Sequence, residues 1–308
     1  MNTSLSRSAA ITEIVISAIF LVFTAVFVGL RTEHVVGVVV FSLLYFASSK
    51  LRKLAVAMLP FIIFGISYDW MRIVPNYTVN PIDTRPLYEA ELALFGITSN
   101  GSAMILGEFF NVHNWPLVDV LAGIFYLCWV PLPIAFGLWL YFSGRKEYYL
   151  RFAIAFLFVN LLGFAIYYVH PAAPPWYVIN YGFEPITSTP GNVAGLIRFE
   201  QITGWSVFQG LYSKNANIFA AVPSLHAAYM LIAFVYALIS KQHKAVLISF
   251  AIVTIGIWFT AVYTCHHYVI DVLLGICCAL VGILLFEKVI LKTGPFRRFV
   301  DRYLNFIS

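Results

Sequence analysis

Long apolar stretches alternate with short polar segments along most of the chain. A helix needs about 20 mainly apolar residues to cross the hydrocarbon layer of a membrane, and residues 11–30 reach that length. Further stretches of this kind follow at residues 34–49, 54–70, 116–142, 149–169, 223–240, 245–264 and 269–291. The pattern predicts an all-α polytopic membrane protein with about eight transmembrane helices, within a range of six to eight. Pro131 and Pro133 are expected to kink the fourth of these helices.

Two long segments interrupt the pattern and are too polar to span a membrane. The first, residues 73–115, is punctuated by prolines and contains a short amphipathic helix at 87–97. Two interpretations of this helix stay open. It lies on the membrane surface or caps a site, or it belongs to a packed extramembrane loop. The second long segment covers residues 170–222.

The composition agrees with a membrane protein. Hydrophobic residues make up 61% of the chain and charged residues 11%, whereas a soluble domain carries about 25% charged residues. The formal charge of +5 comes mainly from the loops. It therefore bears on topology, and we expect no nucleic-acid partner. The first apolar run lacks a small-residue cleavage pattern, so we expect it to be retained as a membrane span.

The positive charges predict an orientation in the membrane. If the N-terminus is cytoplasmic, 14 of the 19 lysines and arginines lie at cytoplasmic ends of the spans and 5 at exoplasmic ends, as the positive-inside rule requires. Both long segments then face the exoplasmic side. We expect one membrane domain over residues 1–308, with N-terminal spans at 11–72, an exoplasmic loop at 73–115 and a helix bundle at 116–292 that includes the exoplasmic loop 170–222.

The four cysteines predict neither a disulfide framework nor a metal site. Cys128, Cys277 and Cys278 fall inside apolar segments, and Cys265 lies near a polar end. Cys277 and Cys278 are neighbours in the chain and poorly placed to pair with each other, and the spacing of the four is not that of a metal site. We therefore expect no metal site at the cysteines. No cofactor is expected either.

The candidates for chemistry lie in two polar stretches at the ends of predicted spans. Pro223 suits the first position of a helix, which puts Ser224 and His226 in a first turn where free N–H groups and the helix dipole favour an anion. His267 and Asp271 are four residues apart, so both project from one helical face and the carboxylate can hold the imidazole. Together these residues predict a phosphoryl-transfer site on the exoplasmic side.

These residue types suit covalent catalysis. Asp271 would accept a hydrogen bond from one ring nitrogen of His267 and leave the other nitrogen free to attack phosphorus. His226 would give a proton to the leaving alkoxide and then take one from the incoming hydroxyl. Either histidine alone is more often an interfacial residue bonded to a carbonyl group. A carboxylate at the membrane edge, however, is costly without a function or a partner.

Other residues are candidates for binding the substrate. His266 lies about 140° around the helix from Asp271 and is interpreted as a supporting residue. Ser224 has two interpretations, a hydroxyl that binds phosphate or a bond within its own first helical turn. Trp176 and Tyr177 are interpreted as interfacial anchors or as the wall of a head-group pocket. A transferring phosphoryl group also needs cations, and the exoplasmic candidates, each more often an ordinary loop residue, are Arg198, Lys214, Arg72 and Arg85.

Two motifs resemble those of a known superfamily. Pro-Ser-Leu-His at 223–226 and His-x-x-x-Asp at 267–271 are similar to motifs of the type 2 phosphatidic acid phosphatases, whose core is a membrane helix bundle that works through a phosphohistidine without a metal. The resemblance is closer to one branch, the fungal-type inositol phosphorylceramide synthases, of which the chain resembles a bacterial member. From about residue 85 to 285 it carries Pro-Ala-Ala-Pro-Pro-Trp-Tyr (171–177), Pro-Gly (190–191), Gly-Leu-Ile-Arg (195–198), Phe-Ala-Ala-Val-Pro-Ser-Leu-His (219–226) and Tyr-Thr-Cys-His-His-Tyr (263–268). By this resemblance His267 is the nucleophile, Asp271 orients it, and His226 is the acid and base.

The chain also departs from the phosphatase pattern. The phosphatases carry a Lys-x6-Arg-Pro motif, which does not precede Pro223 here, and Ser-Arg at the place held by Thr260 and Ala261. Their phosphate-binding cations therefore cannot be carried over to this sequence. Simple lipid phosphatase activity becomes a less favoured interpretation.

The resemblance implies an enzyme that transfers a phosphoinositol, or a similar phospho-head-group, from a glycerophospholipid to ceramide and releases diacylglycerol. The alternatives are a lipid phosphate phosphatase, a transferase that uses another donor such as a polyprenyl-linked lipid, and a non-catalytic membrane scaffold. The expected partners are the two membrane lipids, and an accessory subunit is not indicated. We expect a bacterial inner membrane with a periplasmic site, or alternatively a Golgi membrane with a lumenal site.

Overall fold

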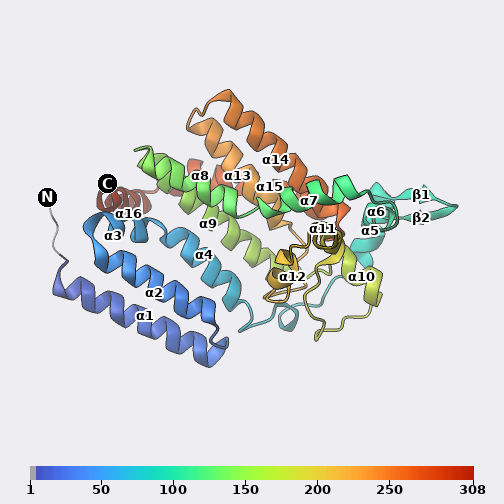
Figure 1. Ribbon diagram of the computed structural model, residues 1–308, viewed down its shortest axis with the longest axis horizontal. Coiled ribbons are helices and arrows are strands. Elements are labelled where there is room, and N and C mark those ends of the chain that lie inside the picture. The colour runs from blue at the N-terminus through green and yellow to red at the C-terminus, as the bar shows by residue number, and fades with distance from the viewer. Residues whose placement is uncertain (1–4) are drawn as a thin grey trace.

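Helices make up nearly all the regular structure of the computed structural model, which describes residues 5–308 (Figure 1). In chain order they are α1 (Arg7–Phe27), α2 (Thr32–Ala47), α3 (Ser49–Ala57), α4 (Leu59–Trp70), α5 (Arg85–Phe95), α6 (Leu106–Val112), α7 (Pro116–Leu127), α8 (Pro131–Phe142), α9 (Lys146–Val169), α10 (Pro175–Tyr181), α11 (Ile197–Thr203), α12 (Val207–Tyr212), α13 (Leu225–Ile239), α14 (Lys244–Tyr263), α15 (Val269–Lys288) and α16 (Gly294–Ile307). Two short strands, β1 (Ile97–Ser99) and β2 (Ser102–Met104), form an antiparallel hairpin. The predicted all-α class is confirmed.

Every apolar stretch of the sequence folds as a helix. α1, α9, α14 and the segment Val269–Lys292 are each long and apolar enough to cross a membrane. The pairs α3–α4 and α7–α8, bent by 45° and 43°, raise the number of candidate spans among residues 5–308 to six, which lies within the predicted range. α2 and α13 are shorter apolar helices of 16 and 15 residues. The predicted kink falls directly before Pro131, which opens α8 and lacks the N–H needed to continue α7.

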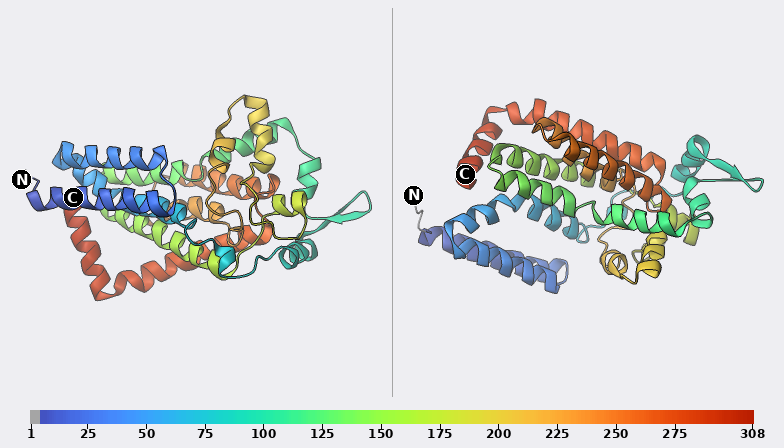
Figure 2. Two further views of the ribbon diagram at one scale, coloured as in Figure 1. Left: turned by 90° about the horizontal axis from the view of Figure 1, so that it is seen from below. Right: turned by 45° about the horizontal axis from the view of Figure 1, so that its top comes forward.

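The long connections gather at one end of the bundle, called the loop end from here on (Figure 2). It carries α5, α6, the β1–β2 hairpin, α10, α11 and α12, whereas the start of α1 and the C-terminal helix α16 lie at the opposite end. The two long segments that the sequence assigns to the same side of the membrane therefore share one end of the molecule.

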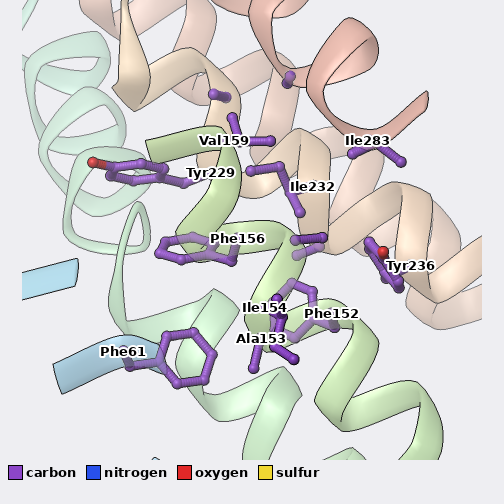
Figure 3. Packing of buried hydrophobic residues seen from close by; sticks show 14 of the residues in the cluster. Phe61, Phe152, Ala153, Ile154, Phe156, Val159, Tyr229, Ile232, Tyr236 and Ile283 are labelled. Atoms are coloured by element: carbon purple, nitrogen blue, oxygen red, sulfur yellow. The ribbon is translucent and has the colours of Figure 1, made fainter. Parts of the chain in front are cut away.

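α9 lies at the centre of the bundle and packs against α4, α8, α13 and α15. On its face toward α13 the ring centroid of Phe156 lies 5.0 Å from that of Tyr229 (Figure 3). A side chain at Gly163 would overlap Leu225, so this glycine lets α9 approach the start of α13 closely. Close packing of this kind drives the association of membrane helices. It holds the first turn of α13 in a fixed position.

α5 occupies the predicted amphipathic stretch, with bounds that differ by two residues at each end. Its Glu91 side chain is buried and accepts hydrogen bonds from the Val269 and Ile270 N–H groups at 2.9 and 3.1 Å. These are two of the N–H groups left unpaired at the start of α15. α5 therefore caps the N-terminus of α15, the helix that carries Asp271.

Candidate active site

Three of the predicted residues meet at the loop end. His226 lies in the first turn of α13, His267 in the turn between α14 and α15, and Asp271 in the first turn of α15. Nδ1 of His226 is 2.9 Å from Nε2 of His267, and Nδ1 of His267 is 3.3 Å from Oδ2 of Asp271. Asp271 is completely buried and His267 nearly so. The three side chains thus form a continuous line of polar contacts.

The partners of His267 determine which ring nitrogen carries its proton. Nδ1 faces the Asp271 carboxylate and also the Ala221 carbonyl oxygen, at 3.1 Å. Since both groups only accept hydrogen bonds, Nδ1 is protonated and Nε2 keeps its lone pair. His226 Nδ1 then donates its hydrogen to this lone pair. His267 is presented as a neutral imidazole with a nucleophilic nitrogen toward His226.

The turn before α15 differs from the predicted geometry. His267 and Asp271 were expected on one face of a helix, but α15 begins at Val269, so His267 precedes it. The expectation was wrong because Asp271 caps the helix by accepting the Tyr268 N–H at 2.9 Å. The same carboxylate reaches back to His267, and the predicted pairing is therefore present although His267 is not helical.

α13 also begins later than expected. Ser224 is its cap, in the extended backbone conformation of a cap residue, and Pro223 lies outside the helix. The Ser224 hydroxyl accepts the Ala227 N–H at 3.4 Å, and the Ser224 N–H donates to the Asp271 carbonyl at 2.9 Å. Of the two interpretations of Ser224, the structure supports the bond within its own helix. The backbone bond also ties the first turns of α13 and α15 together.

A glycine allows this close approach. A Cβ atom at Gly275 would lie 2.1 Å from the Ser224 carbonyl oxygen, a backbone atom that cannot rotate away. Gly275→Ala should therefore push the two first turns apart and lower turnover at least about 100-fold, because a displacement of about 1 Å at a reacting group costs that much. The measurement is the initial rate of purified variants. Gly210→Ala, whose methyl group would meet no atom within 4 Å, is the matched control. Full turnover in Gly275→Ala would contradict this prediction.

The two histidines line a pocket of about 100 Å³, walled mainly by aromatic side chains that include Trp129, Trp176 and Tyr212. Pockets for drug-sized ligands measure about 300–1,000 Å³, so this one suits a head group and leaves lipid chains outside. Among the residues that line it, in the part of the chain that the structure describes, none is Lys, Arg, Asp or Glu. Within residues 5–308, no group of three or more His, Cys, Asp or Glu side chains is placed to hold a metal ion.

Two of the other candidates line this pocket and one does not. The His266 ring is 4% exposed, and its Nδ1 lies 2.9 Å from Thr264 Oγ1. Trp176 is 5% exposed and forms part of the pocket wall, so the interpretation as an interfacial anchor is not supported. Tyr177 is completely buried and donates its hydroxyl to the Glu184 carbonyl at 2.7 Å. It is a packing residue that lies outside the pocket.

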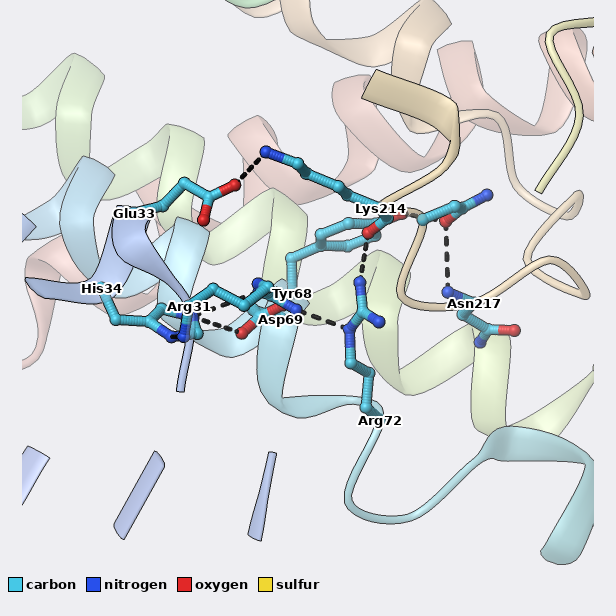
Figure 4. Close-up of polar contacts among 9 residues, drawn as sticks. Arg31, Glu33, His34, Tyr68, Asp69, Arg72, Lys214 and Asn217 are labelled. Carbon is cyan, nitrogen blue, oxygen red and sulfur yellow. Dashed lines mark hydrogen bonds and ion pairs between the residues drawn. The ribbon is translucent and has the colours of Figure 1, made fainter. Parts of the chain in front are cut away.

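The candidate cations all lie away from the pocket wall. The Lys214 ammonium group pairs with Glu33 of α2 (Figure 4). The Arg72 guanidinium donates to the Lys214 carbonyl oxygen and to the Asp69 carboxylate. Arg85 lies over the Phe183 ring, 4.1 Å from its centroid. Arg198 Nε is 2.6 Å from Asp119 Oδ1 of α7. The expectation that Arg198 and Lys214 bind the phosphate has no support from this geometry, because acidic partners on distant helices engage both.

Arg198 should act on stability rather than on substrate binding. Its guanidinium lies 5.1 Å from the Tyr263 ring centroid and pairs with Asp119, whose side chain is 3% exposed. Arg198→Met strands this buried carboxylate, at a cost of about 3–5 kcal/mol, and should lower the melting temperature. The second change Asp119→Leu removes the stranded charge and should restore most of the stability and turnover. A stable double variant without turnover would show instead that Arg198 holds the phosphate.

Several pocket residues were not predicted from the sequence. Tyr68 comes from α4, Trp129 from the bend between α7 and α8, and Asn217 from the loop before α13. The His226 ring lies 4.4 Å from the Trp129 ring, between centroids. Their positions along the chain follow no pattern that distinguishes them from other aromatic and amide residues. Only the kink predicted before Pro131 could have drawn attention to Trp129.

Comparison with known proteins agrees with this geometry. A model of the PAP2 superfamily matches residues 101–285, which include both histidines and Asp271. The chain is 60% identical to a phosphoinositol dihydroceramide synthase of Bacteroides thetaiotaomicron, over 98% of this chain and 99% of that protein. It is 28% identical to the catalytic subunit of the inositol phosphorylceramide synthase of Schizosaccharomyces pombe, over 77% of this chain and 55% of that protein. The inositol phosphorylceramide synthase of Candida albicans is 29% identical over 58% of this chain and 38% of its own length. No solved structure matches significantly.

Proposed function

The chain belongs to the PAP2 superfamily, and from this membership we propose that it is a phosphotransferase of sphingolipid synthesis. It moves a phosphoinositol head group from a glycerophospholipid to a ceramide or dihydroceramide and releases diacylglycerol. The observation that carries the proposal is the line of His226, His267 and Asp271, in which the two histidines line a small pocket whose wall has no Lys, Arg, Asp or Glu.

In the first step the Nε2 lone pair of His267 attacks the phosphorus of the donor lipid. A P–N bond forms while the bond from phosphorus to the diacylglycerol oxygen breaks. With the anionic donor bound, His226 is the imidazolium; it gives its Nδ1 proton to the leaving oxygen and is left neutral, ready to act as a base in the next step. Asp271 and the Ala221 carbonyl hold the Nδ1–H of His267 and stabilise the positive charge that its ring acquires.

In the second step the acceptor takes the place of diacylglycerol. His226 removes the proton from the primary hydroxyl of ceramide, the hydroxyl oxygen attacks phosphorus, and the P–N bond breaks. His267 returns to its neutral form and the head group leaves on ceramide. Because water at this stage would produce free inositol phosphate, the aromatic walls of the pocket favour transfer over hydrolysis.

The lack of cations in the pocket separates this reaction from that of a lipid phosphatase. A phosphomonoester carries close to two negative charges at neutral pH, whereas the phosphodiester of a glycerophospholipid carries one. The N-terminus of α13 and a protonated His226 can balance a single charge. A dianion would call for the arginines and lysines that this pocket lacks. The geometry therefore favours transfer of a diester.

The active site faces the periplasm in this proposal. The 14 to 5 distribution of lysines and arginines supports it, since it assigns both long segments to the exoplasmic side. The loop end holds these segments together with the three catalytic residues.

The direct test uses purified protein in mixed micelles with phosphatidylinositol labelled in its head group. With ceramide or dihydroceramide present, the label should appear on the sphingolipid, and one diacylglycerol should form per transfer. Without acceptor, little label should leave the donor. Rapid release of free inositol phosphate with no transfer would replace the proposal by a hydrolase.

A further inference from the structure

Two polar groups of the pocket have no hydrogen-bond partner among the described residues. They are Nε2 of His266 and Nδ2 of Asn217, and both atoms are buried. Buried polar atoms without partners are uncommon and point to a missing ligand. We propose that His266 and Asn217 form the subsite that recognises the hydroxyl groups of a polyol head group, an assignment that rests on the proposed function.

The contacts of His266 make its Nε2 an acceptor. Thr264 Oγ1 donates its hydrogen to the Thr260 carbonyl at 2.7 Å, so it accepts from His266 Nδ1 at 2.9 Å. Burial, with a smaller contribution from the neighbouring His267, lowers the pKa of His266 to about 3, so the ring is neutral. Its second nitrogen therefore carries a lone pair that no donor among the described residues engages.

Asn217 presents the opposite polarity. Its Oδ1 accepts the Phe219 N–H at 3.0 Å, which fixes the orientation of the amide and leaves Nδ2 as a donor. Its own N–H donates to Asn215 Oδ1 at 3.1 Å, and the same oxygen accepts the Tyr68 hydroxyl at 2.5 Å. The loop that carries Asn217 is thus anchored to α4. The donor is held in place before any ligand binds.

An acceptor and a donor together select a hydroxyl-bearing head group. Each hydroxyl both donates and accepts, so a polyol such as inositol can satisfy Nε2 of His266 and Nδ2 of Asn217. The aromatic walls would also attract a quaternary ammonium group. A quaternary ammonium group cannot accept a hydrogen bond from Asn217 Nδ2, and no carboxylate lines the pocket to balance its charge. Choline-type head groups would therefore leave a buried donor unpaired, which is costly.

The experiment compares His266→Phe and Asn217→Ala with the unmodified protein. Phenylalanine retains the ring packed against Tyr212, whose centroid lies 4.6 Å from that of His266, and Thr264 keeps its bond to the Thr260 carbonyl. Each variant should raise the KM for phosphatidylinositol about tenfold, the effect of one lost hydrogen bond in a buried site. The KM for ceramide should not change. Asn111→Ala, at an exposed position of α6, is the matched control for the amide.

The preference for the donor gives the second readout. In the double variant the ratio of kcat/KM for phosphatidylinositol to that for phosphatidylcholine should fall about 100-fold. The melting temperature should stay close to that of the unmodified protein. Unchanged KM values for phosphatidylinositol, or equal increases for both substrates, would overturn the subsite. Absence of transfer from phosphatidylinositol in the unmodified protein would instead overturn the proposed function and the subsite with it.

Discussion

Replacing His267 by alanine is expected to lower head-group transfer about 10⁴-fold, as the removal of a nucleophile or its base does in other covalent enzymes. The reason is specific to this site. The contacts of its Nδ1 with Asp271 and the Ala221 carbonyl leave His267 Nε2 unprotonated, and this nitrogen faces His226 at the pocket. No intermediate can form without it. Initial rates with labelled phosphatidylinositol and ceramide measure the effect.

The control for this change is His243→Ala. His243 is an exposed histidine that caps α14 at the end of the bundle opposite the loop end. Its removal should leave the transfer rate within about twofold. A His267→Ala protein that folds normally and retains more than a hundredth of the activity would contradict the assignment of His267 as nucleophile.

The second large effect is expected at His226. Because this residue gives a proton in the first step and takes one in the second, His226→Ala should lower transfer about 10²–10⁴-fold, the usual range for one acid–base group. The loss should depend on the leaving group. A donor that releases nitrophenolate needs no proton on departure, so the variant should still take up its head group quickly.

In the His226→Ala variant the intermediate with the head group on His267 should then accumulate, since no base remains to activate ceramide. Measuring nitrophenolate release together with protein-bound label distinguishes the two roles. Slow release from the activated donor as well would show that His226 positions the substrate and does not act as the acid. The substitution Trp139→Ala, at an exposed ring on α8, controls for the loss of an aromatic side chain from a bundle helix.

The sequence was sufficient to predict the elements and the meeting of His226, His267 and Asp271, because both depend on local patterns. Apolar length determines which segments become membrane helices, and helix-capping chemistry places Ser224 and Asp271 at the starts of α13 and α15. The pairing of His267 with Asp271 was predicted for the wrong reason. A spacing of four residues suggested a shared helical face, whereas the structure achieves the contact through the capping turn.

The surroundings of the catalytic residues could not be predicted because they depend on contacts between distant segments. Arg198 was considered for phosphate since it is a cation on the expected side, but its partner Asp119 lies 79 residues away in the chain. Lys214 is likewise bound to Glu33, 181 residues away. Asn217 was not singled out in the sequence. Its place in the pocket wall depends on the fold of the whole loop between α12 and α13.

The measurement that tests the account most directly is a single-turnover chase. Purified protein would be mixed with head-group-labelled phosphatidylinositol without acceptor, quenched at neutral or alkaline pH, digested and mapped by mass spectrometry. The account predicts a phosphoinositol group on the peptide that contains His267, and transfer of that group to ceramide when ceramide is added before the quench. Transfer to ceramide with no protein-bound intermediate, or an intermediate on a residue other than His267, would contradict it.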